Sequence, residues 1–170
     1  MYMENNCWRN STLWQRLSRF LVPLLALLTL FVAVSCAGSV PRDLTAGEKL
    51  WQEQGLKDYD FTVERQCFCP EDWRGPVNIQ VRDGAAVSIT YVSDGTAVTE
   101  GKFDNADTID KLFMILKNAY AGTGDFSQKA DTIDVTYDAQ MGYPKSFWID
   151  VSQQMADEEQ GYVVTSLTAQ

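Results

Sequence analysis

Hydrophobic and polar residues alternate in several short stretches of the chain, the pattern of half-buried β-strands. In segment 59–66, YDFTVERQ, the side chains of Tyr59, Phe61 and Val63 share one face, and polar or charged residues occupy the other. Asp-Gly pairs favour tight hairpins, so Asp83-Gly84 indicates a turn between two strands. The inward residues expected to lie across from one another are Val77, Ile79 and Val81 in the first strand and Val87, Ile89 and Tyr91 in the second. Strands are predicted at 59–66, 76–81, 86–92, 132–137, 146–151 and 162–167.

Two other segments have helical spacing. Between 107 and 120 the apolar residues form one stripe, and Asp107 is expected to cap the helix. A capping box, Thr45 to Glu48, predicts the start of an earlier helix that ends at about Gln54, before Gly55. The apolar stripe of the second helix consists of Ile109, Leu112, Phe113, Leu116 and Tyr120.

These elements predict an α+β fold, with an antiparallel sheet of about six strands and two helices packed on one face. The expected order is helix-βββ-helix-βββ. Pro144 cannot donate a ladder hydrogen bond, so it is placed in the connection between the fourth and fifth strands. We expect a single α+β domain at 45–170, preceded by a tether at 37–44.

The most hydrophobic stretch, FLVPLLALLTLFVAVSC, runs from residue 20 to residue 36 and indicates export from the cytoplasm. Three arginines, at positions 9, 16 and 19, precede it, and Ala33-Val34-Ser35 places small residues before Cys36. The segment 1–36 is therefore predicted to be a signal peptide with a lipobox-like cysteine, and Cys36 to be the lipidated residue. The expected location is the cell envelope, with the membrane reached through this lipid.

Two alternatives for this segment stay open. Ala33-Val34-Ser35 also satisfies the small-x-small rule of an ordinary secretory site, which would give a secreted or periplasmic protein. An uncleaved anchor is the other alternative, although the run is shorter than the roughly 20 apolar residues that span a bilayer and contains Pro23.

Charge and composition exclude several functions. Cleavage before Cys36 removes three arginines and one glutamate, which leaves 11 basic and 22 acidic residues and a formal charge of −11. A surface this acidic argues against binding to nucleic acid and against an electrostatic membrane patch. The chain contains no histidine, the commonest general base and metal ligand, so the sequence favours a protein that is not an enzyme and needs no cofactor.

Cys67-Phe68-Cys69-Pro70 is the most distinctive local motif. Residues two apart in a strand have Cα atoms roughly 6.5–7 Å apart, near the upper limit for a disulfide, so pairing needs a bend. A structural disulfide, a redox-active pair and two reduced thiols or a soft-metal site all remain open. Arg65 and Arg74 lie nearby in sequence and would stabilise a thiolate.

Two groups of polar residues are candidate binding surfaces. The acidic sets Asp131, Asp134 and Asp138, and Asp150 with 157–159, offer carboxylates for a hard cation, but their spacing matches no calcium motif. A possible partner-binding surface consists of Tyr137, Asp138, Tyr143 and Trp148.

Several of these motifs occur together in a fixed order over about residues 48–168, and the chain resembles the family known as domain of unknown function 6174, uncharacterised secreted and lipid-anchored bacterial domains. The resemblance implies an envelope location and a cysteine pair, and it supplies no activity, substrate or catalytic residue. The ordered pieces are a Trp before Tyr59-Asp60-Phe61-Thr62, Cys67-Phe68-Cys69-Pro70, Asp83-Gly84, 108–113, Tyr137-Asp138, Gly142-Tyr143-Pro144, Ile149-Asp150 and Asp157-Glu158-Glu159.

The sequence therefore predicts an envelope-anchored lipoprotein that acts as a non-catalytic binding or assembly module for an envelope protein. A thiol-disulfide redox protein using Cys67 and Cys69 is one alternative, and a cation binder using the acidic sets is another.

Overall fold

The structure, a computed structural model, describes residues 40–170 of the chain. The predicted signal segment 1–36, Cys36 and the first part of the expected tether lie outside the described residues. The elements in chain order are α2 (Arg42–Gln54), β1 (Tyr59–Cys67), the 3₁₀-helix η2 (Glu71–Trp73), β2 (Val77–Arg82), β3 (Ala85–Tyr91), α3 (Ile109–Ala121), β4 (Thr132–Tyr137), β5 (Pro144–Asp150) and β6 (Gln160–Ala169).

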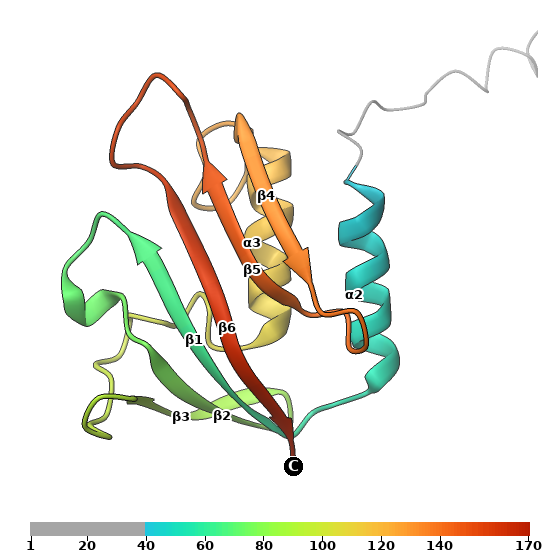
Figure 1. Cartoon of the computed structure of the whole chain (residues 1–170), viewed down its shortest axis with the longest axis vertical. Coiled ribbons are helices and arrows are strands. Elements are labelled where there is room, and N and C mark those ends of the chain that lie inside the picture. The colour runs from blue at the N-terminus through green and yellow to red at the C-terminus, as the bar shows by residue number, and fades with distance from the viewer. Residues whose placement is uncertain (1–39) are drawn as a thin grey trace, which may run out of the picture. The chain divides into compact units, whose positions relative to one another are not determined.

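All six strands join one antiparallel sheet in the order β3-β2-β1-β6-β5-β4 (Figure 1). The chain's first and last strands are neighbours at the centre, where Phe61 lies opposite Ile79 on one side and Leu167 on the other. The first and last strands of the described chain are therefore joined at the middle of the sheet.

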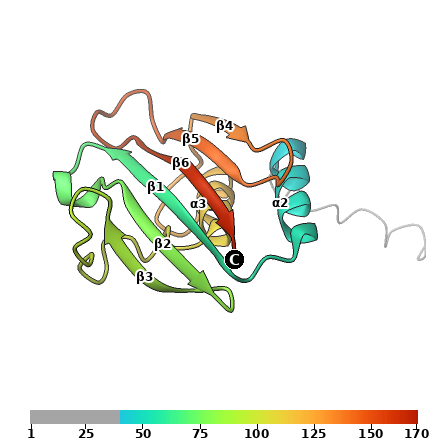
Figure 2. The same ribbon diagram turned by 60° about the horizontal axis from the view of Figure 1, so that its bottom comes forward.

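One face of the sheet carries the hydrophobic core. Tyr59, Phe61 and Val63 of β1 are at most 2% exposed, as the alternating pattern predicts. The helix α3 lies against this face (Figure 2), and four of the five predicted stripe residues are fully buried there, with Tyr120 partly buried. The inward positions of β1 and the apolar stripe of α3 thus form one core.

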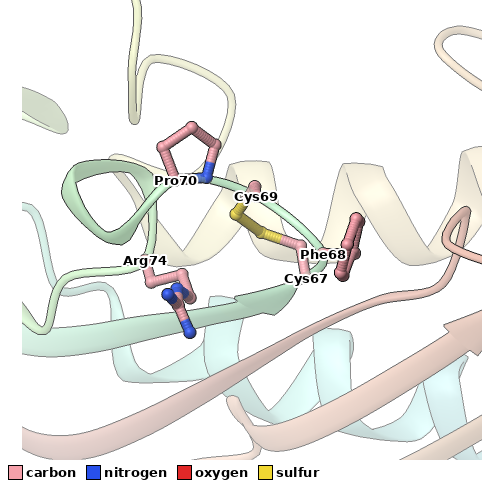
Figure 3. Close-up of a pocket in the computed structure, with 5 residues that line it drawn as sticks. All are labelled: Cys67, Phe68, Cys69, Pro70 and Arg74. Atoms are coloured by element: carbon pink, nitrogen blue, oxygen red, sulfur yellow. A yellow bond between two sulfur atoms is a disulfide. The ribbon is translucent and has the colours of Figure 1, made fainter.

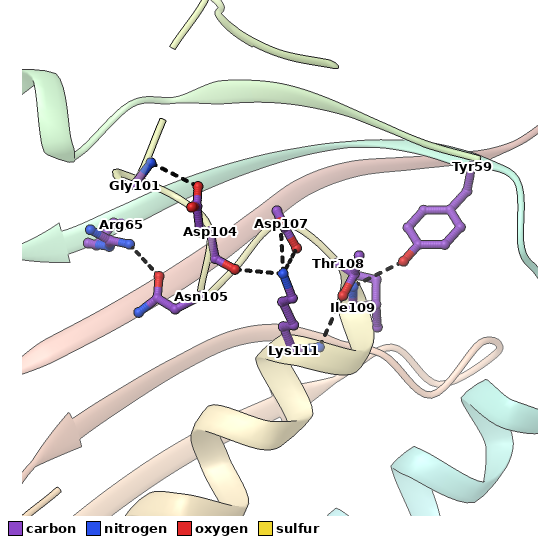
Figure 4. A network of polar contacts seen from close by, with 9 residues as sticks. All are labelled: Tyr59, Arg65, Gly101, Asp104, Asn105, Asp107, Thr108, Ile109 and Lys111. Carbon is purple, nitrogen blue, oxygen red and sulfur yellow. Dashed lines mark hydrogen bonds and ion pairs between the residues drawn. The ribbon is translucent and has the colours of Figure 1, made fainter. Parts of the chain in front are cut away.

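The start of α3 is fixed by polar contacts to β1 (Figure 4). The Tyr59 hydroxyl accepts the Ile109 backbone N–H at 3.1 Å, and burial raises the pKa of Tyr59 to about 12. The predicted cap, Asp107, is wrong: Thr108 occupies the cap position and accepts from the Lys111 N–H at 3.2 Å. Asp107 instead forms an ion pair with the Lys111 ammonium at 2.7 Å.

The helix α2 starts earlier than expected, at Arg42, so the predicted capping box is wrong. Pro41 precedes the first helical residue, and Thr45 lies inside the helix, where its hydroxyl donates to the Pro41 carbonyl at 3.2 Å. Proline suits a helix start because its missing N–H is not needed there. The predicted end at Gln54 is confirmed, with Gly55 in the left-handed conformation at φ 63°.

The predicted fold class needs correction. The expected antiparallel sheet of six strands is present. The helix-βββ-helix-βββ order is wrong, because η2 separates β1 from β2. The regular structure is also mostly β, since strands contain more residues than helices. The two helices also differ in placement (Figures 1 and 2). Whereas α3 crosses the core face, α2 lies beside the β4–β5 turn, where Trp51 contacts Tyr143 edge-on and Glu48 pairs with Lys117 of α3.

Two details of strand register also differ from the prediction. A bulge between Gln80 and Val81 shifts the β2–β3 pairing, so Ala86 lies opposite Val81 and Val87 turns outward, 61% exposed. Pro144 opens β5, opposite Tyr137, instead of lying in the connection. Its position as the first strand residue explains why its missing N–H is tolerated.

We predict that Gly47→Ala destabilises the protein by about 1–3 kcal/mol, the usual cost of overpacking, although alanine normally stabilises a helix interior. A Cβ at Gly47 would stand 2.8 Å from the Tyr137 ring and 2.9 Å from the Gly142 carbonyl oxygen, so α2 would have to move. Denaturant unfolding measures this change. The control is Gln52→Ala on the exposed side of α2, and equal stability of both variants would contradict the packing described.

Candidate functional site

The face of the sheet opposite the core is polar. Its residues alternate with the buried ones, and α2 and α3 both pack on side chains of the buried set. This outward face carries Asp60, Thr62, Glu64 and Gln66 of β1, Asn78 and Gln80 of β2, Asp134 and Thr136 of β4, Ser146 and Trp148 of β5, and Ser166 and Thr168 of β6.

The two halves of the outward face differ in how well their polar groups are paired. Over β1 and β2, the Thr62 hydroxyl donates to the Asn78 side-chain oxygen at 2.8 Å and accepts from Ser166 at 2.9 Å. Asp60 accepts from Arg82 at 2.7 Å and from Gln170 at 3.0 Å. These bonds pair part of this half internally, whereas the half over β4, β5 and β6 contains the partly exposed Trp148.

There, Trp148 lies over a glycine. Trp148 of β5 is paired with Gly161 of β6, and a Cβ at Gly161 would stand 2.7 Å from the indole and 3.4 Å from the Gln66 amide oxygen. The missing side chain leaves room for the indole to extend across β6 toward β1. Trp148 remains 38% exposed, a partly open aromatic surface.

A hollow of about 360 Å³ adjoins this indole. We call it the Trp148 hollow and define it by the outward side chains that line it: Gln66, Asp134, Thr136, Ser146 and Trp148. Asp134 lies directly opposite Trp148 in the β4–β5 ladder, so a carboxylate and an aromatic ring border the same space. No hydrogen bond or ion pair joins either side chain to another residue between 40 and 170.

The end of the sheet next to the hollow has an excess of negative charge. Burial, and then the neighbouring charges of Glu158, Glu159 and Asp131, raise the pKa of Asp150 above its ordinary value. These carboxylates do not line the hollow. The hollow itself suits a cationic group with an apolar body, because the Trp148 ring and the Asp134 carboxylate border the same space.

Only one residue of the sequence-predicted binding surface contributes to this hollow. Tyr143 is 7% exposed on the core side, and Tyr137 stacks on Phe113 with ring centroids 6.3 Å apart. Asp138 shapes the β4–β5 turn, because its carboxylate accepts the backbone N–H groups of residues 140 and 141 at 2.9 Å. The structure does not bring Tyr137, Asp138 and Tyr143 together with Trp148 on one surface.

The acidic sets serve mainly to close a loop. The Glu158 carboxylate accepts from the N–H groups of Val151 and Ser152 at 3.1 and 2.8 Å, and Asp131 accepts from the Gln153 N–H at 3.2 Å. Across residues 40–170, no group of three or more His, Cys, Asp or Glu side chains is arranged to hold a metal ion. In the same part of the chain, every helix is too short or too polar to span a bilayer.

Cys67 and Cys69 form a disulfide at the end of β1, with Cα atoms 5.3 Å apart (Figure 3). Closing so short a loop restricts the unfolded chain little, about 1.5–2 kcal/mol on the loop-entropy scale. Cys67 is also held by its pairing with Gln160 of β6. The bond is therefore a minor contributor to global stability, and it stands in what we call the cysteine loop, residues 67–74.

The base of the cysteine loop is held by Arg65. Its backbone N–H donates to the Arg74 carbonyl at 2.8 Å, and its guanidinium lies 5.9 Å from the centre of the Trp73 ring. Arg65 as a residue is 7% exposed, and its guanidinium lies near the Tyr162 and Phe103 rings. The guanidinium donates to the Tyr162 hydroxyl at 2.9 Å. It also donates to the Asn105 side-chain oxygen at 2.8 Å, as Figure 4 shows. A buried arginine stacked on three rings anchors the loop to the sheet.

Sequence reasoning missed two parts of these sites. Arg65 was one of them, although it has the same strand parity as Tyr59, Phe61 and Val63, and this parity was the signal that would have assigned it to the buried face. No comparable signal marks Gly161 and Gln66, because their contribution depends on the pairing of β5, β6 and β1.

Comparison with known proteins gives one result at the level of the family. The model of the family described as "Family of unknown function (DUF6174)" matches residues 43–169, nearly all of the described chain. No curated protein and no solved structure matches the chain. The match confirms the resemblance drawn from the ordered motifs, and this chain belongs to the DUF6174 family, whose function is unknown.

Proposed function

We propose that this protein is an envelope-anchored lipoprotein and that its domain is a non-catalytic binding module. The occupant we propose for the Trp148 hollow is a basic segment of an envelope protein. The observation that carries this proposal is the partly exposed indole of Trp148, bordered by the Asp134 carboxylate at an acidic end of the sheet.

The chemistry of the hollow favours lysine or arginine as the group that enters. A cation placed over an indole face contributes about 0.5–2 kcal/mol of favourable binding free energy, and more where water is excluded. Asp134 adds a nearby opposite charge, and the formal charge of −11 on the chain from Cys36 onward draws basic partners from a distance. Ser146, Thr136 and Gln66 offer hydrogen-bonding groups around the same space.

The anchoring half of the proposal is supported by sequence alone. The apolar run that ends at Cys36, with its three preceding arginines, is typical of a lipoprotein signal. A domain fixed at a membrane surface meets partners at high local concentration, so the modest affinity of a shallow hollow suffices.

We predict that the purified protein binds an octalysine peptide and that Trp148→Ala weakens this binding by about tenfold or more, as loss of an interfacial tryptophan commonly does. Asp134→Asn should weaken it about two- to fivefold, because an exposed ion pair contributes little. Isothermal titration calorimetry at low and at physiological salt measures both effects, and binding should weaken as salt rises.

Matched controls separate the hollow from general acidity. Glu53→Gln removes a carboxylate on α2, and Met155→Ala removes an apolar side chain that is 51% exposed; both should bind octalysine normally. An octalysine peptide acetylated on every side chain should not bind. If the affinity depended on Trp148 but changed neither with salt nor with Asp134→Asn, the proposal of a basic partner would be contradicted. Such a result would indicate a neutral ligand such as a glycan.

We also predict that the mature protein begins at Cys36 and carries a lipid there. Mass spectrometry of the membrane-extracted protein should give the mass of chain 36–170 plus acyl groups, and Cys36→Ser should abolish the modification. An unmodified soluble chain would indicate plain secretion, and an intact N-terminus in the membrane would indicate an uncleaved anchor.

A further inference from the structure

The Cys67–Cys69 disulfide is presented at the surface, apart from the Trp148 hollow. Cys67 is the last residue of β1, whereas Cys69 lies in the loop before η2. Phe68 between them is 81% exposed, the highest exposure among the large hydrophobic residues of 40–170. An aromatic ring this exposed beside the bond offers an apolar contact to a partner chain that docks there.

A second observation concerns the space around the sulfur atoms. A pocket of about 320 Å³ is lined by both cysteines, Phe68, Pro70 and Arg74 (Figure 3). It combines an apolar wall with a guanidinium, so a peptide can rest on Phe68 and Pro70 while Arg74 stabilises a thiolate that forms nearby. The Arg65 contacts hold the base of this loop, so the pocket is presented from a fixed support.

We propose that the Cys67–Cys69 disulfide is a thiol-exchange site that oxidises a dithiol in a partner polypeptide. This activity goes beyond the proposed binding role and uses none of the residues that define the Trp148 hollow.

The exchange balances in two steps. A partner thiolate attacks one sulfur of the Cys67–Cys69 bond, forming a disulfide between protein and partner, and the other cysteine leaves as a thiolate near Arg74. The partner's second thiolate then attacks its own sulfur in that mixed disulfide and releases the remaining cysteine. The partner loses two electrons and two protons to become a disulfide, and Cys67 and Cys69 become thiols; a small-molecule disulfide such as oxidised glutathione restores the bond.

The first test uses the purified oxidised protein and a reduced peptide with two cysteines flanked by apolar residues. Peptide oxidation, followed by thiol trapping and mass spectrometry, should be about tenfold faster than with the Cys67→Ser/Cys69→Ser variant and should reach one peptide per protein. With oxidised glutathione present, the protein should turn over repeatedly. A rate equal to that of the double variant would overturn the proposal.

Two further variants test the pocket while keeping the disulfide. Phe68→Ala should slow peptide oxidation but leave the reaction with glutathione unchanged, since glutathione has no apolar flank to dock. Arg74→Gln should slow both about two- to threefold, and Arg42→Gln on α2 serves as the charge control. Equal rates in all three variants would contradict the assigned roles of Phe68 and Arg74.

Equilibrium with glutathione provides a readout that does not depend on the double variant folding. We expect the pair to be substantially reduced in a glutathione buffer that leaves the disulfides of a stable secreted protein intact. If the pair stayed oxidised in that glutathione buffer, it would be a structural disulfide and the proposal would be overturned. Octalysine binding at the Trp148 hollow would be unaffected by this result.

Discussion

The burial of alternate β1 side chains beneath α3 is the constraint on which the rest of this structure depends. Tyr59, Phe61 and Val63 are almost inaccessible at the centre of the sheet, and each such burial contributes about 1.5–3 kcal/mol. The Tyr59 hydroxyl also fixes the first residue of α3. Because strand side chains alternate strictly, this packing directs Asp60, Thr62 and the following alternate residues to the opposite face.

Both candidate sites follow from that division. Arg65 continues the buried series of β1. Its guanidinium lies near the buried Tyr162 and Phe103 rings and the more exposed Trp73 ring, so the cysteine loop that follows has a firm base. On the other face, Trp148 points away from the core, and Gly161 on the adjacent strand gives its indole room. The domain thus presents two chemically different surfaces, an acidic aromatic hollow and an exposed disulfide.

Much of this arrangement was predictable from local pattern. The strand periodicity of residues 59–66 and the helical stripe of 109–120 located the core, and Asp83-Gly84 located a hairpin. Three local details were not predictable in this way, because each depends on tertiary contacts that override local preference. They are the bulge at Val81, the early start of α2 and the cap at Thr108. The Trp148 hollow was also missed, since it joins the β4–β5 hairpin to Gln66 of β1, which is distant in sequence. The apparent Tyr137–Tyr143 surface faces α2 and α3.

The most direct test of the binding account is to map octalysine on the isotopically labelled protein by NMR. The account predicts that amide and indole shifts change at Gln66, Asp134, Ser146, Trp148 and Gly161, on the outward side of β1, β4, β5 and β6. Residues of α3 and of the β1–β2 half should stay unchanged. Shifts that concentrate on α2 and α3, or that spread evenly over every acidic residue, would contradict it.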